Sequence, residues 1–301
     1  MIVATTLAEL RSALAPRRDA PIAVVPTMGA LHEGHLSLVT AARARAATVV
    51  LTIFVNPTQF TEQADLDAYP RALDDDLAKA GAAGVDVVFA PTAAEMYPTG
   101  FATTVSIAGP LTETFEGAVR GRAHFDGVAT IVSKLLLAAL ADTAYFGQKD
   151  AQQVAVVRRL VRDLGIPTEI VVVPTSRDDD GLARSSRNVR LTPADRVRAL
   201  ALPRALAAAA RAAADGEQDA AALRAIAAHE LDAAGLTPDY LAVVDSDGFA
   251  ELDRLDRDAV LVVAARVGAV RLLDNVVLAP VTASSDILDD RPVAAPTGSP
   301  R

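Results

Sequence analysis

The sequence predicts an α/β fold, with a doubly wound parallel sheet followed by a smaller α+β unit. Short β-branched runs alternate with helical patterns through residues 1–175, and these runs are predominantly apolar. Strands that are apolar on both faces are typical of a parallel sheet covered by helices on both sides. The expected strands are 22–25, 48–55, 85–89, 143–146 and 168–173, and the expected helices are 36–46, 71–83, 126–141 and 150–164.

A change in composition after Pro174 predicts a domain boundary. The polar run 175–180 ends the alternating pattern, so we expect one domain at 1–175 and a second at 176–283. Residues 284–301 are rich in Pro, Asp and Ser and are expected to form a disordered tail. In the second domain the expected elements are alanine-rich helices at 193–214 and 218–234 and strands at 240–244, 260–266 and 269–278.

The composition excludes several classes of protein. A formal net charge of −9 leaves no generally basic surface for nucleic acid. The lack of cysteine excludes disulfides, thiolate catalysis and cysteine-based zinc sites. No apolar run reaches the ~20 residues of a membrane span, and residues 1–15 are predicted to be a strand entering a helix, not a signal peptide. We expect a cytoplasmic protein that binds neither nucleic acid nor a membrane.

The most informative motif is PTMGALHEGH at residues 26–35. It joins an apolar strand to a helix start, where unpaired N–H groups and the helix dipole favour a bound anion. His32 and His35 are three residues apart, so both imidazoles could face a phosphate. A pair of surface histidines in a turn is the alternative. Met28 and Gly29 allow close approach to the backbone, which favours a nucleotide-phosphate site.

A second motif, FVNPTQF at residues 54–60, leaves the next strand through Asn-Pro, which cannot continue into a helix. It places the amides of Asn56 and Gln59 at the edge of the sheet where ligands bind. Amides both donate and accept hydrogen bonds, so they suit a substrate with hydroxyl and carboxylate groups. For Asn56, ordinary turn chemistry explains the residue equally well. Gln59 is not a turn residue, which favours a role in binding.

A third motif, FGQKDAQQ at residues 146–153, follows another strand and opens a helix. Gly147 allows close approach, and Lys149 supplies a cation for phosphate oxygens. Asp150 stands where it could cap the helix, and Gln153, one turn further on, would face the same cleft. Gly-x-Lys-Asp alone is a weak signal, and its position after a parallel strand strengthens it.

Other polar clusters are more ambiguous. Residues 184–188, RSSRN, combine two hydroxyls with two guanidiniums and suit a phosphate clamp between the domains. A solvated loop is the alternative, because the acids at 178–180 could pair with these arginines. The acidic run 74–76 is expected to supply helix-start charge and solvation, and not a metal site. His124 either reaches the cleft or caps a helix.

Together these motifs resemble the pantothenate synthetase (pantoate–β-alanine ligase) family. His-x-Gly-His is shared by a broad nucleotidyltransferase superfamily, whereas FVNPTQF combined with GQKDAQQ is much more specific. The resemblance extends over about residues 20–280. The segments that carry it are 26–35, 54–60, 65–71, 147–153, 185–188, 263–266 and 271–275.

The resemblance implies a Rossmann-like ATP-binding domain, a smaller C-terminal lid domain, a homodimer and a requirement for Mg²⁺. It also implies two chemical steps. Pantoate and ATP first give pantoyl adenylate and pyrophosphate, and β-alanine then attacks the adenylate to give pantothenate and AMP. Two departures from the family pattern stand out: Arg184, where many members have an apolar residue, and Gln148, where others have Glu.

Site residues follow from the same resemblance. His35, His32, Lys149 and Arg187 are the expected catalytic residues, and Gln59 and Gln153 are expected to bind pantoate, with Gln59 also near β-alanine. No metal ligands are assigned. The expected ATP contacts are Met28, Gly29, Ala30, Leu31, His32, Glu33, Gly34, His35, Gly147, Gln148, Lys149, Asp150, Ser176, Arg184, Ser185, Ser186 and Arg187.

Two other functions fit part of the pattern. A nucleotidyltransferase that joins a nucleotide to a phosphate ester would need extra cations for the acceptor phosphate, whereas Asn56, Gln59 and Gln153 suit a neutral or carboxylate acceptor. A non-catalytic nucleotide sensor would keep the fold but lack a catalytic residue, and none is missing from the motifs. A fragment of an aminoacyl-tRNA synthetase is disfavoured by the acidic charge.

Overall fold

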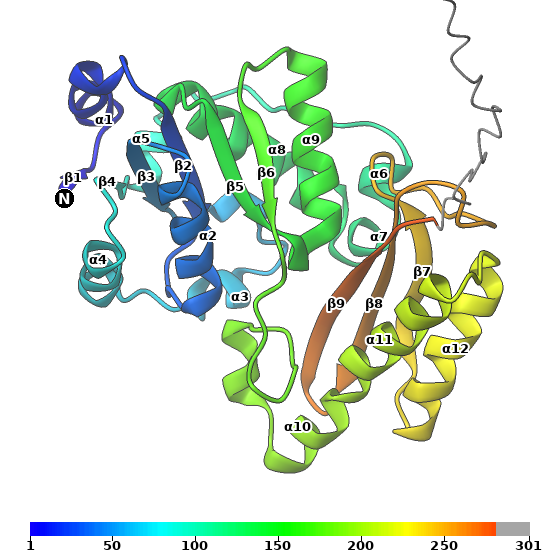
Figure 1. Cartoon of the computed structure of the whole chain (residues 1–301). Coiled ribbons are helices and arrows are strands. Elements are labelled where there is room, and N and C mark those ends of the chain that lie inside the picture. The colour runs from blue at the N-terminus through cyan, green and yellow to red at the C-terminus, as the bar shows by residue number, and fades with distance from the viewer. Residues whose placement is uncertain (281–301) are drawn as a thin grey trace, which may run out of the picture.

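A computed structural model describes residues 1–280 of the chain, so the tail expected at 284–301 lies outside the described residues. Six strands form one sheet in the order β1-β4-β3-β2-β5-β6, and all neighbouring pairs are parallel (Figure 1). The strands are β1 (Ile2–Ala4), β2 (Ile22–Thr27), β3 (Thr48–Ile53), β4 (Val87–Phe89), β5 (Thr143–Gly147) and β6 (Glu169–Val173).

Alternate residues of the central strand β2 are buried on opposite faces of this sheet. Ile22 and Val24 pack with α1, α8 and α9, whereas Ala23 and Val25 pack with α2 and α4. The period of two places alternate side chains on opposite faces, so a strand buried on both faces must be apolar throughout. The predicted parallel sheet covered on both sides is confirmed. The helices are α1 (Leu7–Leu14), α2 (Glu33–Arg43), α4 (Leu73–Ala82), α8 (Arg122–Ala139) and α9 (Ala151–Leu164).

The strand order reverses between β2 and β5. From β2 the chain moves outward through β3 and β4, and from β5 it moves the other way to β6. Ligands of open α/β sheets bind beyond the carboxyl ends of the strands at such a switch point. The motif at 26–35 follows β2 and the motif at 146–153 runs out of β5, so both emerge at this place.

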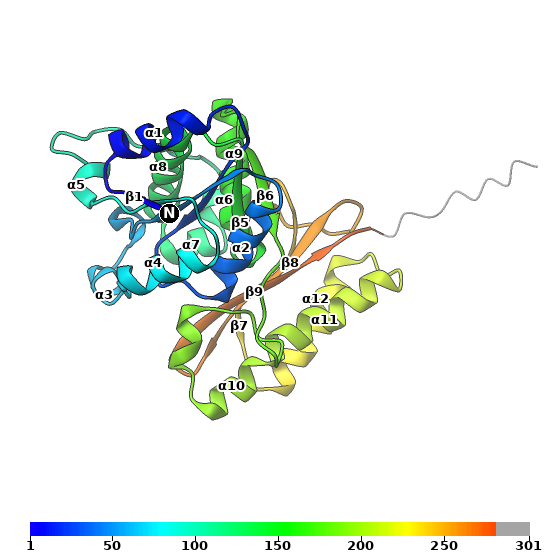
Figure 2. The same ribbon diagram turned by 60° about the vertical axis from the view of Figure 1, so that its left-hand side comes forward.

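The second sheet is antiparallel and has three strands, β7 (Pro238–Asp245), β8 (Ala259–Val267) and β9 (Val270–Leu278). One face carries Val243, Leu261 and Val263 and is covered by α11 (Ala201–Ala214) and α12 (Ala220–Ala233), as Figure 2 shows. Residues of the other face, Val244 and Val262 among them, join an apolar cluster with Phe125 of α8 and Ala155 of α9. The second sheet is therefore packed directly against the first part of the chain.

Two expectations about helices were wrong. The helix expected at 193–214 is two helices, α10 (Pro193–Ala199) and α11, with a break at Leu200. Pro203 has no N–H to donate to the carbonyl oxygen of Ala199, which favours a break there. The sequence pattern also missed four short helices, which are too short to show a helical period: α3 (Gln63–Asp67), α5 (Ala93–Met96), α6 (Pro110–Glu113) and α7 (Glu116–Arg120). Among the helices of residues 1–280, none has the length and apolar composition of a membrane span.

Candidate active site

A cavity of about 510 Å³ opens beyond the carboxyl ends of β2 and β5. His32 and His35 line it from the start of α2, and Lys149 lines it from the turn after β5. Arg187 lines it from the segment that connects the two sheets, and Gln59 from the turn after β3. The groups that the sequence placed in separate motifs therefore share one cavity at the switch point.

The loop that leads into α2 is held by a buried carboxylate. Asp76 of α4 is 1% exposed, and it accepts the backbone N–H of Ala30 at 2.9 Å and that of Leu31 at 2.7 Å. Gly29 has φ +82°, and a Cβ there would lie 2.8 Å from the Asp76 Oδ2 atom. The expected helix-start position of the acidic run is confirmed, but solvation is wrong for Asp76, because this carboxylate is buried beneath the loop.

The paired imidazoles cap α2 with the same nitrogen. His32 Nδ1 accepts the N–H of Gly34 at 3.1 Å, and His35 Nδ1 accepts the N–H of His32 at 3.4 Å. The ring centroids are 4.1 Å apart. Because Nδ1 is an acceptor in both rings, the neutral imidazoles carry their proton on Nε2. Neither Nε2 atom has a hydrogen-bond partner among the described residues. Both atoms keep some accessible surface, so both N–H groups are open to the cavity.

Burial keeps both imidazoles neutral. Desolvation, with the nearby His32, lowers the pKa of His35 to about 3. Desolvation also lowers the pKa of His32, assisted by the cations of Lys149 and Arg184. At neutral pH each ring therefore offers one N–H donor and no positive charge. The positive charge for an anion comes from elsewhere in the cavity.

The turn after β5 supplies one such charge. Lys149 Nζ lies 3.6 Å from the carboxylate of Asp150, which is half exposed. Desolvation favours the neutral acid, but the cations of Lys149, Arg120 and Arg187 outweigh it and lower the pKa of Asp150. Asp150 stands at the N-cap position of α9, yet its side chain makes no capping bond. The predicted capping role is therefore wrong, and the carboxylate lines the cavity instead.

The two arginines of the connecting segment differ. Arg184 Nε lies 3.3 Å from the carboxylate of Asp178 and donates to the carbonyl oxygen of Arg177 at 3.0 Å. The alternative that nearby acids satisfy these arginines therefore holds for Arg184. Arg187 is exposed, and it has no ion pair among residues 1–280. Ser185 Oγ accepts the N–H of Arg187 at 3.2 Å and shapes the turn that presents it. Arg187 is the arginine free to meet a ligand.

The amides of the second motif have unequal roles. Asn56 is 1% exposed, and its Nδ2 donates to Gln59 Oε1 and to the carbonyl oxygen of Gly127, both at 3.1 Å. Its Oδ1 accepts the hydroxyl of Tyr97 at 2.7 Å. Asn56 is thus fully paired inside the protein and holds the side chain of Gln59 in place. Gln59 Nε2 has one described partner, the sulfur of Met28 at 3.1 Å, a weak acceptor.

Five of the predicted ATP contacts lie away from the cavity. Leu31 is buried, Glu33 is exposed, and Gln148 Nε2 donates to Asn275 Oδ1 at 3.0 Å. Gly29 and Ala30 shape the loop above Asp76. None of these five residues lines the cavity. The predicted residues that line the cavity are Met28, His32, Gly34, His35, Gln59, Gly147, Lys149, Asp150, Gln153, Ser176, Arg184, Ser185, Ser186 and Arg187.

A family model described as Pantoate-beta-alanine ligase matches residues 2–277 of the chain. The chain belongs to the pantoate–β-alanine ligase family. It is 52% identical over 283 residues to the pantothenate synthetase of Rhizorhabdus wittichii, covering 93% of this chain and 99% of the relative. The crystal structure of the Thermus thermophilus pantothenate synthetase is 48% identical, with a TM-score of 0.87 over 93% of this chain and 100% of that chain.

A pantoate–β-alanine ligase from Francisella tularensis has been solved as a complex with beta-gamma ATP and β-alanine. It is 33% identical to this chain, with a TM-score of 0.74, and the match covers 92% of this chain and 97% of that one.

Sequence reasoning missed a charge cluster around the buried Glu116 that joins α7 to the antiparallel sheet. Glu116 of α7 pairs with Arg120 at 2.7 Å and with Arg271 of β9 at 2.7 Å, and it accepts the hydroxyl of Tyr240 at 3.1 Å. Arg120 lines the cavity. The spacing of Glu116 and Arg120, four residues apart, is the one local signal that could have drawn attention to them. No local pattern shows that Arg271 completes the cluster.

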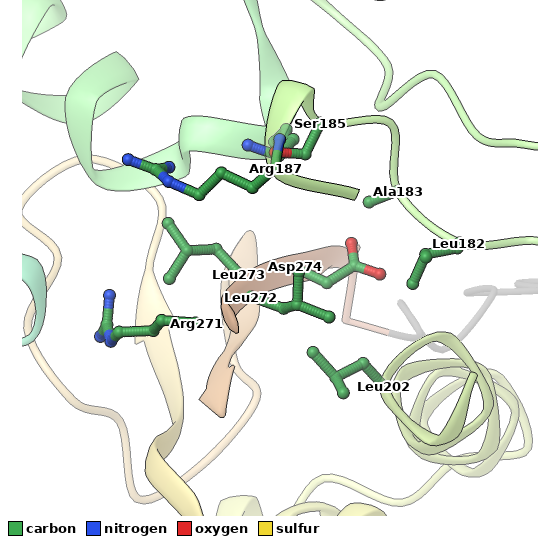
Figure 3. A pocket seen from close by; sticks show the side chains of 10 residues that line it. Leu182, Ala183, Ser185, Arg187, Leu202, Arg271, Leu272, Leu273 and Asp274 are labelled. Atoms are coloured by element: carbon green, nitrogen blue, oxygen red, sulfur yellow. The ribbon is translucent and has the colours of Figure 1, made fainter. Parts of the chain in front are cut away.

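Strand β9 also supports the Lys149 turn. Asn275 Nδ2 donates to the carbonyl oxygens of Gln148 at 3.0 Å and Lys149 at 2.9 Å. Next to it, Asp274 accepts from Arg177 at 2.7 Å and 3.0 Å. A second, much smaller hollow of about 10 Å³ lies beside β9, and Figure 3 shows the side chain of Arg187 at its edge. The second sheet therefore fixes the backbone that carries Lys149.

The part of the chain that the structure describes shows no cluster of side chains that could hold a metal ion by itself. Within residues 1–280, no group of three or more His, Asp or Glu side chains is placed to hold a metal ion. A Mg²⁺ ion bound with a nucleotide takes most of its ligands from phosphate oxygens and water.

Proposed function

We propose that the chain joins pantoate to β-alanine with ATP, through a pantoyl-adenylate intermediate, and releases AMP and pyrophosphate. Ligation of pantoate to β-alanine is the activity for which its family is named. One observation carries the proposal: a single cavity is lined by donors for a triphosphate and by the amides of Gln59 and Gln153. A site with both sets of groups suits a nucleotide beside a hydroxy acid.

The first step needs alignment and charge stabilisation more than a protein nucleophile. The carboxylate of pantoate attacks the α-phosphorus of ATP, and the bond from that phosphorus to the pyrophosphate oxygen breaks. Negative charge grows on the phosphate oxygens as this happens. Lys149 and Arg187 supply positive charge, and the Nε2–H groups of His32 and His35 supply neutral donors that need no reorganisation.

The nucleotide is expected to bring Mg²⁺ with it, as the family resemblance implies. The ion would neutralise charge on the triphosphate, and the protein contributes the surrounding donors. Gln59 is proposed to hold pantoate, because Asn56 fixes its Oε1 and leaves its Nε2 with only a sulfur partner. In the second step the amine of β-alanine attacks the acyl carbon and AMP departs.

The decisive experiment is the exchange of labelled pyrophosphate into ATP in the absence of β-alanine. Formation of a pantoyl adenylate makes this exchange depend on pantoate. Addition of β-alanine should then convert the adenylate to pantothenate and AMP. Exchange at the same rate with and without pantoate, or exchange that requires a phosphate ester, would disprove the proposal. The second result would favour a nucleotidyltransferase that joins a nucleotide to a phosphate ester. Tight binding of ATP without any AMP released would indicate a nucleotide sensor.

We also propose a homodimer in the cytoplasm and a domain boundary near residue 175. Two observations support the boundary: β6 ends at Val173, and a separate apolar cluster is drawn entirely from residues 182–278. The homodimer and the location rest on the family resemblance. Sedimentation equilibrium measures the mass of the assembly, and fractionation of the source cells measures the location.

A further inference from the structure

Three imidazoles line the cavity, and one differs from the other two. His124, in the first turn of α8, has its Nδ1 at 2.7 Å from the backbone carbonyl oxygen of Gln59. A carbonyl oxygen can only accept, so Nδ1 of His124 carries a proton. In the neutral ring, Nε2 then has a free lone pair. His32 and His35 have the opposite arrangement, with Nδ1 accepting and Nε2 donating.

The lone pair of His124 is accessible from the cavity. Its Nε2 has no hydrogen-bond partner among the described residues, and this atom keeps some accessible surface. The sequence left open that His124 caps a helix. This interpretation is wrong for α8, because Gly121 is its N-cap residue. The ring is therefore held at one nitrogen, and its other nitrogen is available to a ligand.

The charges around His124 favour the neutral ring. Burial and the cation of Arg120 on α7 lower its pKa, whereas the Gln59 carbonyl and the carboxylates of Glu116 and Asp150 raise it. The balance is a pKa below the ordinary value for histidine. Near pH 7 this imidazole is a hydrogen-bond acceptor at Nε2. The other two rings in the cavity have their acceptor nitrogens occupied by backbone N–H groups.

The proposed reaction needs one such acceptor, and only in its second step. Pantoate attacks as a carboxylate and has no proton to lose. β-Alanine carries an ammonium group with three protons, and the amide product keeps one, so two protons must leave. Proton removal by a positioned imidazole is a common form of general-base catalysis. The backbone carbonyl oxygen of Gln59 accepts the Nδ1–H of His124, and the side chain of Gln59 is the one that we propose to hold pantoate, so both residues face the same part of the cavity.

We propose that His124 Nε2 takes a proton from the β-alanine nitrogen while that nitrogen attacks the pantoyl adenylate. The new bond joins this nitrogen to the acyl carbon. The bond from the acyl carbon to the phosphate oxygen breaks, and its electron pair leaves with AMP. One proton leaves the ammonium group to solvent before the attack, which frees the electron pair of the nitrogen, and the proton taken by Nε2 afterwards passes to water in the cavity. The inference rests on the proposed function, because it assigns one residue to one of its two steps.

The substitution His124→Asn tests this assignment. The amide nitrogen of Asn can replace Nδ1 and still donate to the Gln59 carbonyl, but no base replaces Nε2. Pantoate-dependent exchange of pyrophosphate into ATP should stay within about threefold of the wild-type rate. Single-turnover reaction of preformed pantoyl adenylate with β-alanine should slow by about 10²–10⁴-fold, the usual contribution of a general base. His229→Asn, at an exposed position on α12, is the matched control and should change neither rate.

Each outcome decides the matter. Unchanged amide formation in His124→Asn overturns the proposal. Equal loss of exchange and amide formation also overturns it, because a role in shaping the Gln59 turn would affect both steps. His124→Ala separates the roles further, since it removes the bond to Gln59 as well and should also weaken the exchange. If the wild-type protein shows no pantoate-dependent exchange, the proposed function fails first, and that failure is distinct from failure of the His124 assignment.

Discussion

Asn275 of β9 donates a hydrogen bond to the backbone carbonyl oxygen of Lys149, over 2.9 Å, and so connects the antiparallel sheet to the turn that carries the cavity's ammonium group. Asn275 is 4% exposed and makes a second bond to the carbonyl oxygen of Gln148. Loss of both bonds leaves two partly buried carbonyl oxygens without these donors. The position of Lys149 then depends on a looser turn.

Replacement of Asn275 by Ala should therefore lower kcat/KM for ATP by about tenfold, the equivalent of one to two net hydrogen bonds. Steady-state kinetics with ATP varied at saturating pantoate measures this effect. Val277→Ala is the control, because Val277 is 54% exposed on the same strand. Normal ATP kinetics in Asn275→Ala would show that the turn holds its shape without the two hydrogen bonds from the Asn275 side chain.

The buried Asp76 should be sensitive to a change that keeps its size. Asp76→Asn removes the charge and replaces one acceptor oxygen by an NH₂ group. This NH₂ group cannot accept a hydrogen bond, so the backbone N–H of either Ala30 or Leu31 loses its acceptor. The free energy of unfolding should fall by about 1–3 kcal/mol, the cost of leaving a buried donor unpaired. Urea denaturation measures the loss. Asp74→Asn, an exposed position in the same helix turn, should change stability by less than about 0.5 kcal/mol.

His35→Ala should reduce turnover by about 10²-fold or more, the scale for removing a donor to transition-state charge. The fold should stay intact, because the bond that His35 Nδ1 accepts is long, at 3.4 Å. Glu33→Gln on the same helix turn is the control, since Glu33 does not line the cavity. Measurements of kcat and of the circular dichroism spectrum separate activity from folding. A variant with near-normal kcat contradicts the role of His35.

Acid should destabilise the protein before its carboxylates titrate. The folded-state pKa values of His32, His35 and His124 lie below the ordinary value, so below about pH 6.5 the unfolded chain binds more protons at these three positions, and for His35 this difference extends down to its folded-state pKa of about 3. The free energy of unfolding therefore rises with pH in this window and falls as the pH drops below about 6.5. Each imidazole contributes a slope of up to about 1.4 kcal/mol per pH unit.

Urea denaturation at several pH values measures that slope. His35→Ala should show a shallower dependence than the wild-type protein, because its pKa of about 3 is removed from the folded state. Identical slopes in the two proteins would mean that His35 is not held neutral by burial.

Pantoate binding should depend on both cavity glutamines. Gln59→Ala and Gln153→Ala should raise KM for pantoate more than KM for ATP, because the two amides face the acid and not the triphosphate in the proposed arrangement. Kinetics with each substrate varied in turn make the comparison. Gln63→Ala, an exposed residue of α3, serves as the control. An unchanged KM for pantoate in both variants removes the assignment.

Local patterns were sufficient for most of the architecture. Apolar runs predicted β2 to β6, because a strand buried on both faces must be apolar at every position. The binding motifs were placed correctly after the carboxyl ends of these strands. Long-range pairs were not predictable from such patterns. Asp76 reaches Leu31 across 45 residues, and Asn275 reaches Lys149 across 126, so nothing near either residue in the chain shows its partner.

Misassignments in the site have the same origin. Asn56 resembles a ligand amide or a turn residue, and the hydroxyl of Tyr97 and the carbonyl of Gly127 show that it is an internal support. Asp150 resembles a helix cap, but its carboxylate makes no capping bond and lies beside Lys149 in the cavity. The residue types were read correctly in each case. Their partners, which decide their roles, come from distant segments.

Both faces of the antiparallel sheet are apolar, and one of them rests on Phe125 and Ala155 of the other part of the chain. A shortened protein that stops near residue 175 would expose these side chains to water. Such a fragment should self-associate when expressed alone, and the two halves should melt together in a calorimeter as one cooperative transition. Any truncation meant to isolate the nucleotide-binding half would have to replace this missing partner surface with polar residues.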